Sequence, residues 1–367
     1  MTAPAARALV LEEPRHLVQR AFAMPEVGDD DGLLRVEACG LCGTDHEQFT
    51  GTLPGPGGRP FIPGHESVGV IEAVGPRAAA RWNVAVGDRV AVEVFLSCRD
   101  CDECRAGRYR RCVRHGMRDM YGFVAADVVP GLWGGYASHQ YLAPDSMLLP
   151  VPPSLDPAVA TLFNPLGAGI RWGVTLPDTQ PGAVVAVLGP GVRGLSACAA
   201  VKEAGASFVL ITGYGPRDAE RLRLASEFGA DLAVDVAVDD PVRALRDATG
   251  GLADVVVDVT AKAPAALGQA VGLARAGGTI VLAGTRGSPD TPGFWPDTVV
   301  YKELHLIGAL GVDAVAYRAA LDLLASGRYP FAELPRRCAG FDDADALLRS
   351  MAGASDQLPP VHGVIVP

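Results

Sequence analysis

The sequence predicts an α/β protein with two domains, a β-rich one followed by a doubly wound parallel sheet. The 367 residues exceed the roughly 250–300 at which a single hydrophobic core stops growing. From about residue 33 to residue 149 the sequence predicts short strands separated by glycine and proline, and after the proline-rich run VPPSLDP apolar strands alternate with helices. We expect a β-rich domain at 1–155, a parallel-sheet domain at 156–311, and a C-terminal segment at 312–367 that returns to the first domain.

Turn residues and apolar runs locate the individual elements. In the first domain the runs LLRVEACG, SVGVIEAVG, RVAVEVFL and YASHQYLA predict strands, separated by glycine and proline turns. In the second domain we expect strands at 184–188, 208–212, 232–234, 255–257, 279–283 and 304–308, with helices such as 194–203 and 219–228 between them. Six strands with this spacing match a dinucleotide-binding fold. A helix at 317–326 and a last strand in HGVIVP follow.

Composition excludes several classes of partner. The formal net charge is −10 and no Lys/Arg cluster lies on an expected helix, so we expect no nucleic acid and no membrane surface as a partner. The opening residues carry several charges and lack the apolar centre of a signal peptide. No apolar run approaches the ~20 residues of a membrane span. A cytoplasmic location is therefore expected, where thiols stay reduced and clustered cysteines more often hold metal than disulfides.

Four cysteines form one candidate metal site. Cys98, Cys101, Cys104 and Cys112 have the spacing C-x2-C-x2-C-x7-C, which lets the sulfurs turn back on one point and satisfies the tetrahedral preference of zinc. Because four protein ligands leave no place for substrate, we expect a structural zinc. Its loss, for instance by replacing Cys101, should lower stability. Two disulfides, free thiols without a role, or an iron–sulfur cluster are the alternatives. The cations expected to offset the thiolate charge are Arg105, Arg108, Arg110 and Arg111.

A second candidate metal site joins Cys42 in GLCGTDHE to His65 and Glu66 in PGHESVG. A catalytic zinc needs about three protein ligands and one exchangeable position, and thiolate, imidazole and carboxylate are its usual partners. The residues lie in expected turns flanked by glycines, where side chains can converge. Taken singly, each is as easily explained by packing or by a hydrogen bond.

A glycine-rich loop is the candidate nucleotide site. Gly189, Gly191 and Gly194 form G-x-G-x-x-G between an expected strand and an expected helix. Glycines permit the tight turn and close backbone approach, while the helix N-terminus favours a pyrophosphate. A merely structural turn is the alternative. The candidate cofactor-binding residues of the loop are Gly189, Pro190, Gly191, Val192, Arg193 and Gly194.

The end of the following strand distinguishes NAD from NADP, and the acid usual there is missing. The strand ends near Gly213, and Arg217 and Asp218 follow. Arg217 would pair with the 2′-phosphate of NADP, whereas Asp218 would bind the ribose hydroxyls of NAD. A solvated loop with neither role is a third possibility. We favour NAD by a small margin and keep NADP open.

The ordered series of GLCGTD, PGHE-x-x-G, GDRV, the four-cysteine lobe, GGYA, the glycine loop and KELHLIGA resembles the zinc-containing medium-chain alcohol dehydrogenase family over nearly the whole chain. The resemblance implies a GroES-like catalytic domain, into which both chain ends pack, and a Rossmann domain between them. It also implies the roles of individual residues. Cys42 and His65 would bind the catalytic zinc, with Glu66 as a direct or intermittent ligand. Thr44 would hydrogen-bond the substrate oxygen and begin a proton relay with His46 or Glu47 as outer members, and Asp45 would orient His65.

Two departures concern the branch of the family. The sequence CGTDHE, with Glu47 where the family often has histidine, is similar to the polyol and glucose dehydrogenases. The motif TLFNPLGAG resembles the Glu-Pro-Leu motif of that branch, but Asn164 replaces the acid. Because an amide oxygen is a poor zinc ligand, Asn164 is a weak candidate, and a zinc-bound water or Glu66 is the expected fourth ligand.

The resemblance thus implies an oxidoreductase that transfers a hydride between a secondary or polyol-type alcohol and NAD(P), with two zinc ions per chain. Zinc as a Lewis acid lowers the pKa of a bound alcohol, and the cofactor takes the hydride. Alternatives are an NAD(P)H-dependent quinone or enoyl reductase of the same fold and a nucleotide-binding protein without turnover. The expected partner is a small alcohol or carbonyl substrate. The family also suggests a homodimer or homotetramer, paired near 283–311.

Overall fold

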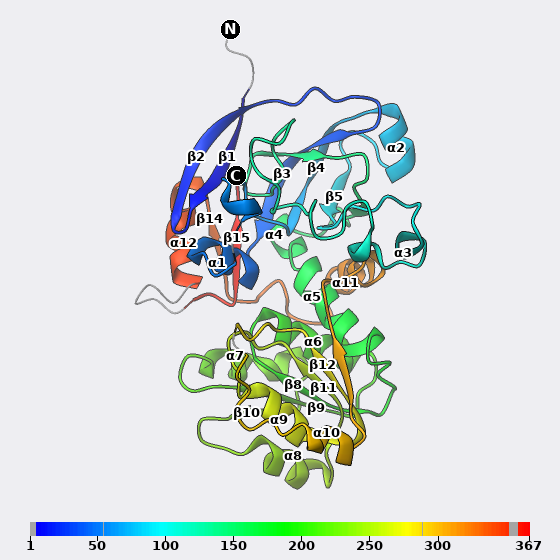
Figure 1. Ribbon diagram of the computed structural model, residues 1–367, viewed down its shortest axis with the longest axis vertical. Helices are drawn as coiled ribbons and strands as arrows, with labels where there is room; N and C mark the ends of the chain where they lie inside the picture. Colours follow the sequence, from blue (N-terminus) through cyan, green and yellow to red (C-terminus); the bar gives the residue numbers. More distant parts are fainter. Residues whose placement is uncertain (1–4, 54, 288, 352–358) are drawn as a thin grey trace. The chain divides into compact units, whose positions relative to one another are not determined.

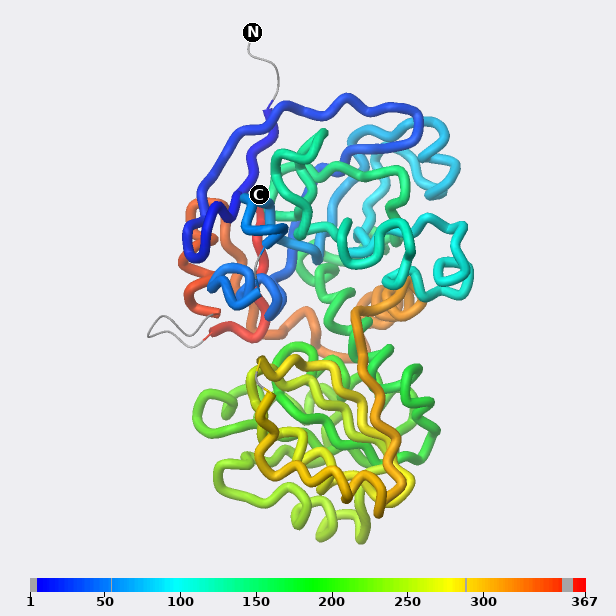
Figure 2. Tube along the Cα trace, in the orientation of Figure 1, coloured from blue at the N-terminus to red at the C-terminus, as the bar shows by residue number. Residues whose placement is uncertain are grey.

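The structure, a computed structural model, describes residues 5–53, 55–287, 289–351 and 359–367 (Figure 1). The chain divides into two compact units. The first comprises the chain up to Phe163, Asp313–Gly327 and the chain from Phe331 onward, and the second comprises Asn164–Val312 with Arg328–Pro330. In Figure 2 the red C-terminal trace accordingly lies among the blue N-terminal segments of the first unit. Within the described residues, no helix has the length and apolar character needed to cross a bilayer.

The first unit is built on a seven-stranded sheet with the order β14-β15-β3-β4-β5-β7, in which β6 also pairs with β3. β3 and β4 are antiparallel, with Cys39 opposite Ser67, so the residues that follow β3 and those that precede β4 meet at one end of the sheet. A separate hairpin joins β1 to β2. The strands are β1 Ala5–Glu13, β2 His16–Ala23, β3 Gly32–Gly40, β4 Ser67–Val74, β5 Arg89–Val92, β6 His139–Leu142, β7 Leu148–Pro150, β14 Arg336–Ala339 and β15 His362–Ile365.

Short helices connect and cover these strands, and the core beneath them includes the fully buried side chains of Phe49, Tyr121 and Tyr136. The helices with most of their residues in the first unit are α1 Gly43–Thr50, η1 Pro56–Gly58, α2 Pro76–Trp82, α3 Asp102–Arg105, η2 Tyr109–Arg111, α4 Pro157–Ala160, α11 Ala314–Ser326, η5 Phe341–Asp343 and α12 Ala344–Met351.

The second unit is a six-stranded parallel sheet with the order β10-β9-β8-β11-β12-β13. This is the doubly wound order, which turns back at β8 and β11. The strands are apolar because both faces are covered, and each fully buried Val, Leu or Ile stabilises by about 1.5–3 kcal/mol. The strands are β8 Val184–Leu188, β9 Phe208–Gly213, β10 Leu232–Asp235, β11 Ala253–Asp258, β12 Ala274–Leu282 and β13 His305–Gly308. The helices are α5 Phe163–Ile170, η3 Arg171–Thr175, α6 Val192–Glu203, α7 Ala219–Leu224, η4 Ala225–Phe228, α8 Pro241–Thr249, α9 Ala266–Leu273 and α10 Asp297–Tyr301.

Candidate functional site

Cys42, His65 and Glu66 converge at one end of the β3–β4 pair. Cys42 follows β3 and is the N-cap of α1, while His65 and Glu66 immediately precede β4. One potential ligand atom from each residue lies within 4.8 Å of the others, and all three residues are buried. The antiparallel register brings these distant sequence positions together as one three-ligand cluster.

Two glycines make room for this cluster. A Cβ at Gly40 would lie 2.5 Å from Oε2 of Glu66, and a Cβ at Gly64 would lie 2.5 Å from the ring of Tyr136. Gly64 also has φ +89°, a left-handed conformation that other residues rarely adopt. Larger residues at these positions would therefore displace the Glu66 carboxylate and the turn that presents His65.

Asp45, only 1% exposed, braces both ligand-bearing loops. Its Oδ2 accepts a hydrogen bond from the backbone N–H of Cys42 at 2.8 Å, and its Oδ1 accepts one from the N–H of Gly64 at 3.2 Å. Oδ1 also lies 3.5 Å from Nδ1 of His65, so the carboxylate charge acts on the imidazole at close range. Asp45 thus fixes the positions of two candidate ligands.

The cluster concentrates negative charge away from water. Burial lowers the pKa of His65, but the Asp45 carboxylate and the Cys42 thiolate outweigh it and hold that pKa well above its usual value. Burial and the charges of Asp45 and its neighbours also raise the pKa of Tyr136 well above its usual value. Buried negative charge is costly unless a cation balances it, and thiolate, imidazole and carboxylate are donors that zinc prefers. The residues present therefore fit a zinc ion.

Thr44, His46 and Glu47 lie on α1, whereas the flanking glycines had suggested a turn. The helix begins here because reciprocal hydrogen bonds cap its N-terminus. The Cys42 sulfur accepts the backbone N–H of Asp45, and the Asp45 carboxylate accepts the backbone N–H of Cys42, an arrangement of the capping-box type. The Cys42 sulfur lies 3.6 Å from Oγ1 of Thr44. Thr44 therefore borders the cluster, and His46 and Glu47 are half-buried further along the same helix.

The four cysteines of the lobe around α3 and η2 form a second cluster. One ligand atom from each lies within 4.8 Å of the others. The sulfurs of Cys98 and Cys104 are 3.7 Å apart, close to the ~3.8 Å expected between two thiolates that bind a tetrahedral zinc at ~2.3 Å each. The set of four thiols fits a structural zinc.

Backbone N–H groups stabilise two of the thiolates of this cluster, whereas burial raises the pKa of Cys104 to about 12. Burial raises the pKa of Cys112, but hydrogen bonds from backbone amides, that of His115 first, bring it down to about 6. The pKa of Cys101 is lowered by the backbone amides of Val113 and Cys104. Thiolate is the form that binds metal.

Two of the four arginines of the lobe have carboxylate partners. Arg105 pairs with Asp100 at 2.6 Å, and Arg108 pairs with Glu103 at 2.9 Å. These two cations therefore balance carboxylates of the lobe, and their part in offsetting the thiolate charge stays a prediction.

The glycine loop joins β8 to α6. Gly189 has φ +99°, and Gly191 is the N-cap of α6. A Cβ at Gly194 would lie 1.8 Å from the carbonyl oxygen of Gly189, so only glycine fits there. Val192 and Arg193 form the first turn of α6, whose leading N–H groups have no partner within the helix and can face a pyrophosphate.

The end of β9 lies beside this loop. The N–H of Gly189 donates to the carbonyl of Thr212 at 3.1 Å, and a Cβ at Gly213 would lie 3.0 Å from both Pro190 Cγ and Asp218 Cβ. Arg217 is exposed. The structure thus brings Gly213 and Asp218 to the glycine loop, with Arg217 on the surface next to them.

Asn164, 3% exposed, also approaches the glycine loop. Its Oδ1 accepts a hydrogen bond from Nη2 of Arg193 at 3.2 Å. The guanidinium of Arg193 stacks over the ring of Trp172, 5.1 Å from its centroid. The amide oxygen considered as a metal ligand is therefore bonded to an arginine.

Sequence reasoning missed a buried ion pair at the same edge of the sheet. Asp258, which ends β11 and is fully buried, pairs with Arg286, which follows β12. Arg286 also donates to the carbonyl of Thr260 at 2.9 Å, and a Cβ at Gly189 would lie 3.0 Å from Cγ2 of Thr260. The pair ties two strand ends together beside the glycine loop. The signal in the sequence was an acid closing the apolar run VVVD.

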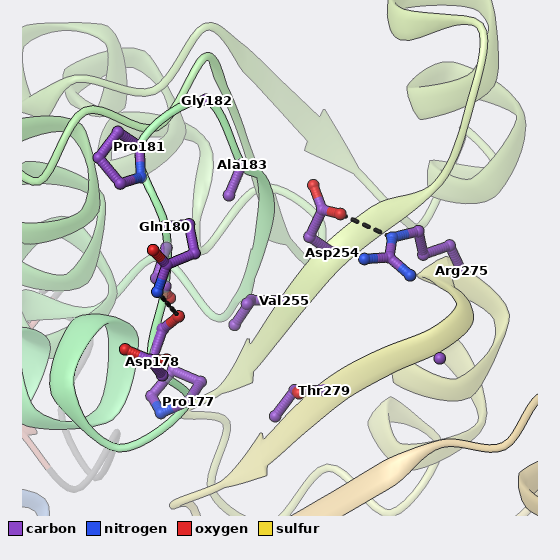
Figure 3. A pocket seen from close by; sticks show the side chains of 12 residues that line it. Pro177, Asp178, Gln180, Pro181, Gly182, Ala183, Asp254, Val255, Arg275 and Thr279 are labelled. Carbon is purple, nitrogen blue, oxygen red and sulfur yellow. Dashed lines mark hydrogen bonds and ion pairs between the residues drawn. The ribbon is translucent and has the colours of Figure 1, made fainter.

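A cavity of about 380 Å³ lies elsewhere in the second unit (Figure 3). It is lined by Ala183, just before β8, and by Asp254 near the start of β11. Asp254 pairs with Arg275 at 2.6 Å and accepts from the N–H of Val184 at 2.7 Å. This is the amino-terminal edge of the strands, whereas ligands of doubly wound sheets bind at the carboxyl edge. The cavity is therefore separate from the glycine loop.

Comparison with known proteins identifies the family. Residues 28–153 match the model of the alcohol dehydrogenase GroES-like domain, and residues 193–326 match that of the zinc-binding dehydrogenases. The chain is 70% identical over 98% of each chain to a Mycobacterium tuberculosis protein named "Probable alcohol dehydrogenase adh". It is 31% identical to the sorbitol dehydrogenase of Bacillus subtilis, over 88% of this chain and 86% of the relative.

A solved structure leads to the same family. A protein of Sinorhizobium meliloti 1021 assigned as a zinc-binding dehydrogenase, solved with NADP, matches with a TM-score of 0.84 and 29% identity over 99% of this chain and 100% of that one. The expected GroES-like and Rossmann architecture is confirmed. The chain belongs to the zinc-containing medium-chain alcohol dehydrogenase family, as an oxidoreductase whose cofactors are zinc and a nicotinamide dinucleotide.

Proposed function

We propose that Cys42, His65 and Glu66 hold the catalytic zinc and that the enzyme oxidises secondary or polyol-type alcohols. The observation that supports this most directly is the convergence of three different zinc-type donors within 4.8 Å. The hydroxyl of Thr44 lies 3.6 Å from the Cys42 sulfur. When bound, zinc supplies Lewis acidity that favours loss of the alcohol proton, and the nicotinamide accepts the hydride.

The chain's own residues would position the substrate and move its proton. Thr44 Oγ1 accepts the hydroxyl proton of the alcohol and releases the proton of its own hydroxyl to the next group. Glu47 and His46, half-buried on the same helix, receive the proton and release it to water. Asp45 keeps His65 in orientation and does not itself touch the substrate. The four cysteines of the lobe hold a second zinc that contributes only to stability.

The cofactor would bind along the glycine loop. Backbone N–H groups of Gly191, Val192 and Arg193 contact the pyrophosphate, since the glycines let it approach the backbone. Asn164 would act by fixing Arg193 and would leave the remaining zinc position to water or substrate. Sorbitol dehydrogenase among the relatives supports a polyol-type substrate.

A panel of alcohols tests this function. Primary, secondary, aromatic and polyol alcohols are each offered with NAD and with NADP, and absorbance of the reduced nicotinamide is followed. We expect the highest kcat/KM with a secondary or polyol alcohol. Reduction of quinones or enones together with no turnover of any alcohol would contradict the proposal.

We also propose that the enzyme is a cytoplasmic dimer that pairs along β13. A cytoplasmic location suits a cluster of reduced thiols. β13, four residues long, is the last strand of its sheet, and the unpaired N–H and C=O groups of an edge strand can pair with another chain. Apolar side chains surround it: Leu306 is 38% exposed, Val300 71% and Tyr301 72%. Antiparallel pairing of two such edges across a two-fold axis would cover these residues.

Replacing Leu306 with lysine should convert the dimer to a 38.1 kDa monomer, because a charge would be buried against the same charge of the second copy. Light scattering coupled to size exclusion measures the mass. Val238→Lys, at a valine that is 77% exposed next to β10 at the opposite end of the sheet, is the control and should stay dimeric. A monomeric parent protein would refute the interface.

A further inference from the structure

We propose that Asp218 supplies the ribose-binding carboxylate that β9 lacks and makes the enzyme select NAD over NADP. The inference deepens the proposed function, because it rests on the glycine loop as the dinucleotide site. It concerns only residues of the second unit.

Asp218 is the N-cap residue of α7 but does not cap it. The carboxylates of Asp156, Asp240 and Asp313 each accept an N–H from the first turn of their helices, which is the usual role of an N-cap aspartate. Asp218 makes no such bond. Its Oδ2 instead accepts the N–H of Tyr214 at 3.0 Å, so the carboxylate is turned back toward the end of β9.

The side chain of Asp218 occupies the space over Gly213. A Cβ built on Gly213 would lie 3.0 Å from Cβ of Asp218 and 3.0 Å from Cγ of Pro190 in the glycine loop. In NAD-binding Rossmann folds an acid near the end of this strand accepts hydrogen bonds from the ribose hydroxyls. Here glycine in the strand leaves room for an acid that comes from five residues later in the chain.

Hydrogen bonds fix the carboxylate and leave it able to bind a diol. Arg221 donates to Oδ1 of Asp218 at 3.1 Å. The side chain of Asp218 is 20% exposed and that of Arg221 is 17% exposed. A carboxylate has about four acceptor positions. The bonds from Tyr214 and Arg221 use two of them, and the other two remain for the two hydroxyls of the ribose.

The same turn is unfavourable for a 2′-phosphate. Oxygens of a phosphate need N–H donors, but the N–H of Tyr214 is bonded to Asp218 and that of Gly215 to Oδ1 of Asp235 at 2.8 Å. A phosphate would therefore meet two carboxylates, and like charges at close range repel. Arg221 is already paired with Asp218, which leaves the exposed Arg217 as the cation for an NADP phosphate.

Calorimetric titration of the full chain tests the inference without any alcohol. The probes are NAD, NADP and their adenosine-end fragments 5′-AMP and 2′,5′-ADP. We expect the parent protein to bind NAD and 5′-AMP at least about tenfold more tightly than NADP and 2′,5′-ADP. Asp218→Asn should weaken NAD and 5′-AMP about tenfold, since a hydrogen bond to a charged group is lost, and should strengthen binding of both phosphorylated probes.

Asp240→Asn is the matched control, because Asp240 is an N-cap aspartate of the same unit that caps its own helix; both sets of affinities should stay unchanged. Tighter binding of NADP by the parent protein, or an equal loss for all four probes in Asp218→Asn, would overturn the inference. If alcohol oxidation proceeds in that case, the proposed function stands. Binding of neither dinucleotide would contradict the proposed function and this inference together.

Discussion

Replacing Cys42 with serine should reduce alcohol turnover by about 10³-fold or more, because Lewis-acid stabilisation of the developing alkoxide contributes several kcal/mol to the barrier. Serine keeps the shape of the side chain but is a far weaker zinc ligand than thiolate. Asp45 would still accept the N–H of residue 42, since that bond involves the backbone, so α1 and the fold should be retained. Initial rates with the best alcohol of the panel measure the effect.

Three further measurements separate this result from misfolding. Metal analysis should fall from two zinc ions per chain to one, while the melting temperature and the affinity for NAD stay close to those of the parent protein. Cys338→Ser, at an exposed thiol on β14, should remain fully active. Ordinary activity in the Cys42→Ser enzyme would show that the metal site is assigned wrongly.

Replacing Cys101 with serine should act on stability instead. A structural zinc contributes its binding free energy to folding. The four thiolates lie in a lobe with only a small apolar cluster, which includes Val94, Phe95 and Tyr109. We expect the melting temperature to fall on the order of 10 °C. Scanning calorimetry with and without added zinc measures this change.

The activity of Cys101→Ser distinguishes the two metal sites. At a temperature well below its transition the variant should oxidise alcohols at a rate close to that of the parent protein, with one zinc per chain. Cys338→Ser again serves as the control and should melt normally. A Cys101→Ser enzyme that melts like the parent protein but has lost activity would exchange the roles assigned to the two clusters.

Much of the second unit could be predicted from the sequence because its strands are buried on both faces. Continuous apolar runs bounded by glycine and proline mark such strands clearly, and β8 has the predicted bounds, Val184–Leu188. The hairpin of β1 and β2 was not predicted. Its second strand, HLVQRAFA, is largely exposed and lacks a regular alternation, so the pattern that predicts strands is weak there.

In the candidate site, residue types could be predicted but local conformation could not. Cys42, His65 and Glu66 are recognisable from their chemistry, and the structure brings them together. That Thr44–Glu47 would be helical depends on a cap formed by a sulfur and Asp45, a combination rarer than the usual hydroxyl cap. The pairing of Asp258 with Arg286 joins positions 28 residues apart, and no spacing rule connects them.

The bracing of both ligand loops by one aspartate has a consequence for how the metal enters and leaves. The hydrogen bonds that Asp45 accepts from the N–H groups of Cys42 and Gly64 require no metal ion. The metal-binding side chains should therefore stay close together after a chelator removes the zinc. The loops that carry these side chains should have the same conformation with and without metal. Cobalt or cadmium would then bind to a preformed site without refolding of the protein.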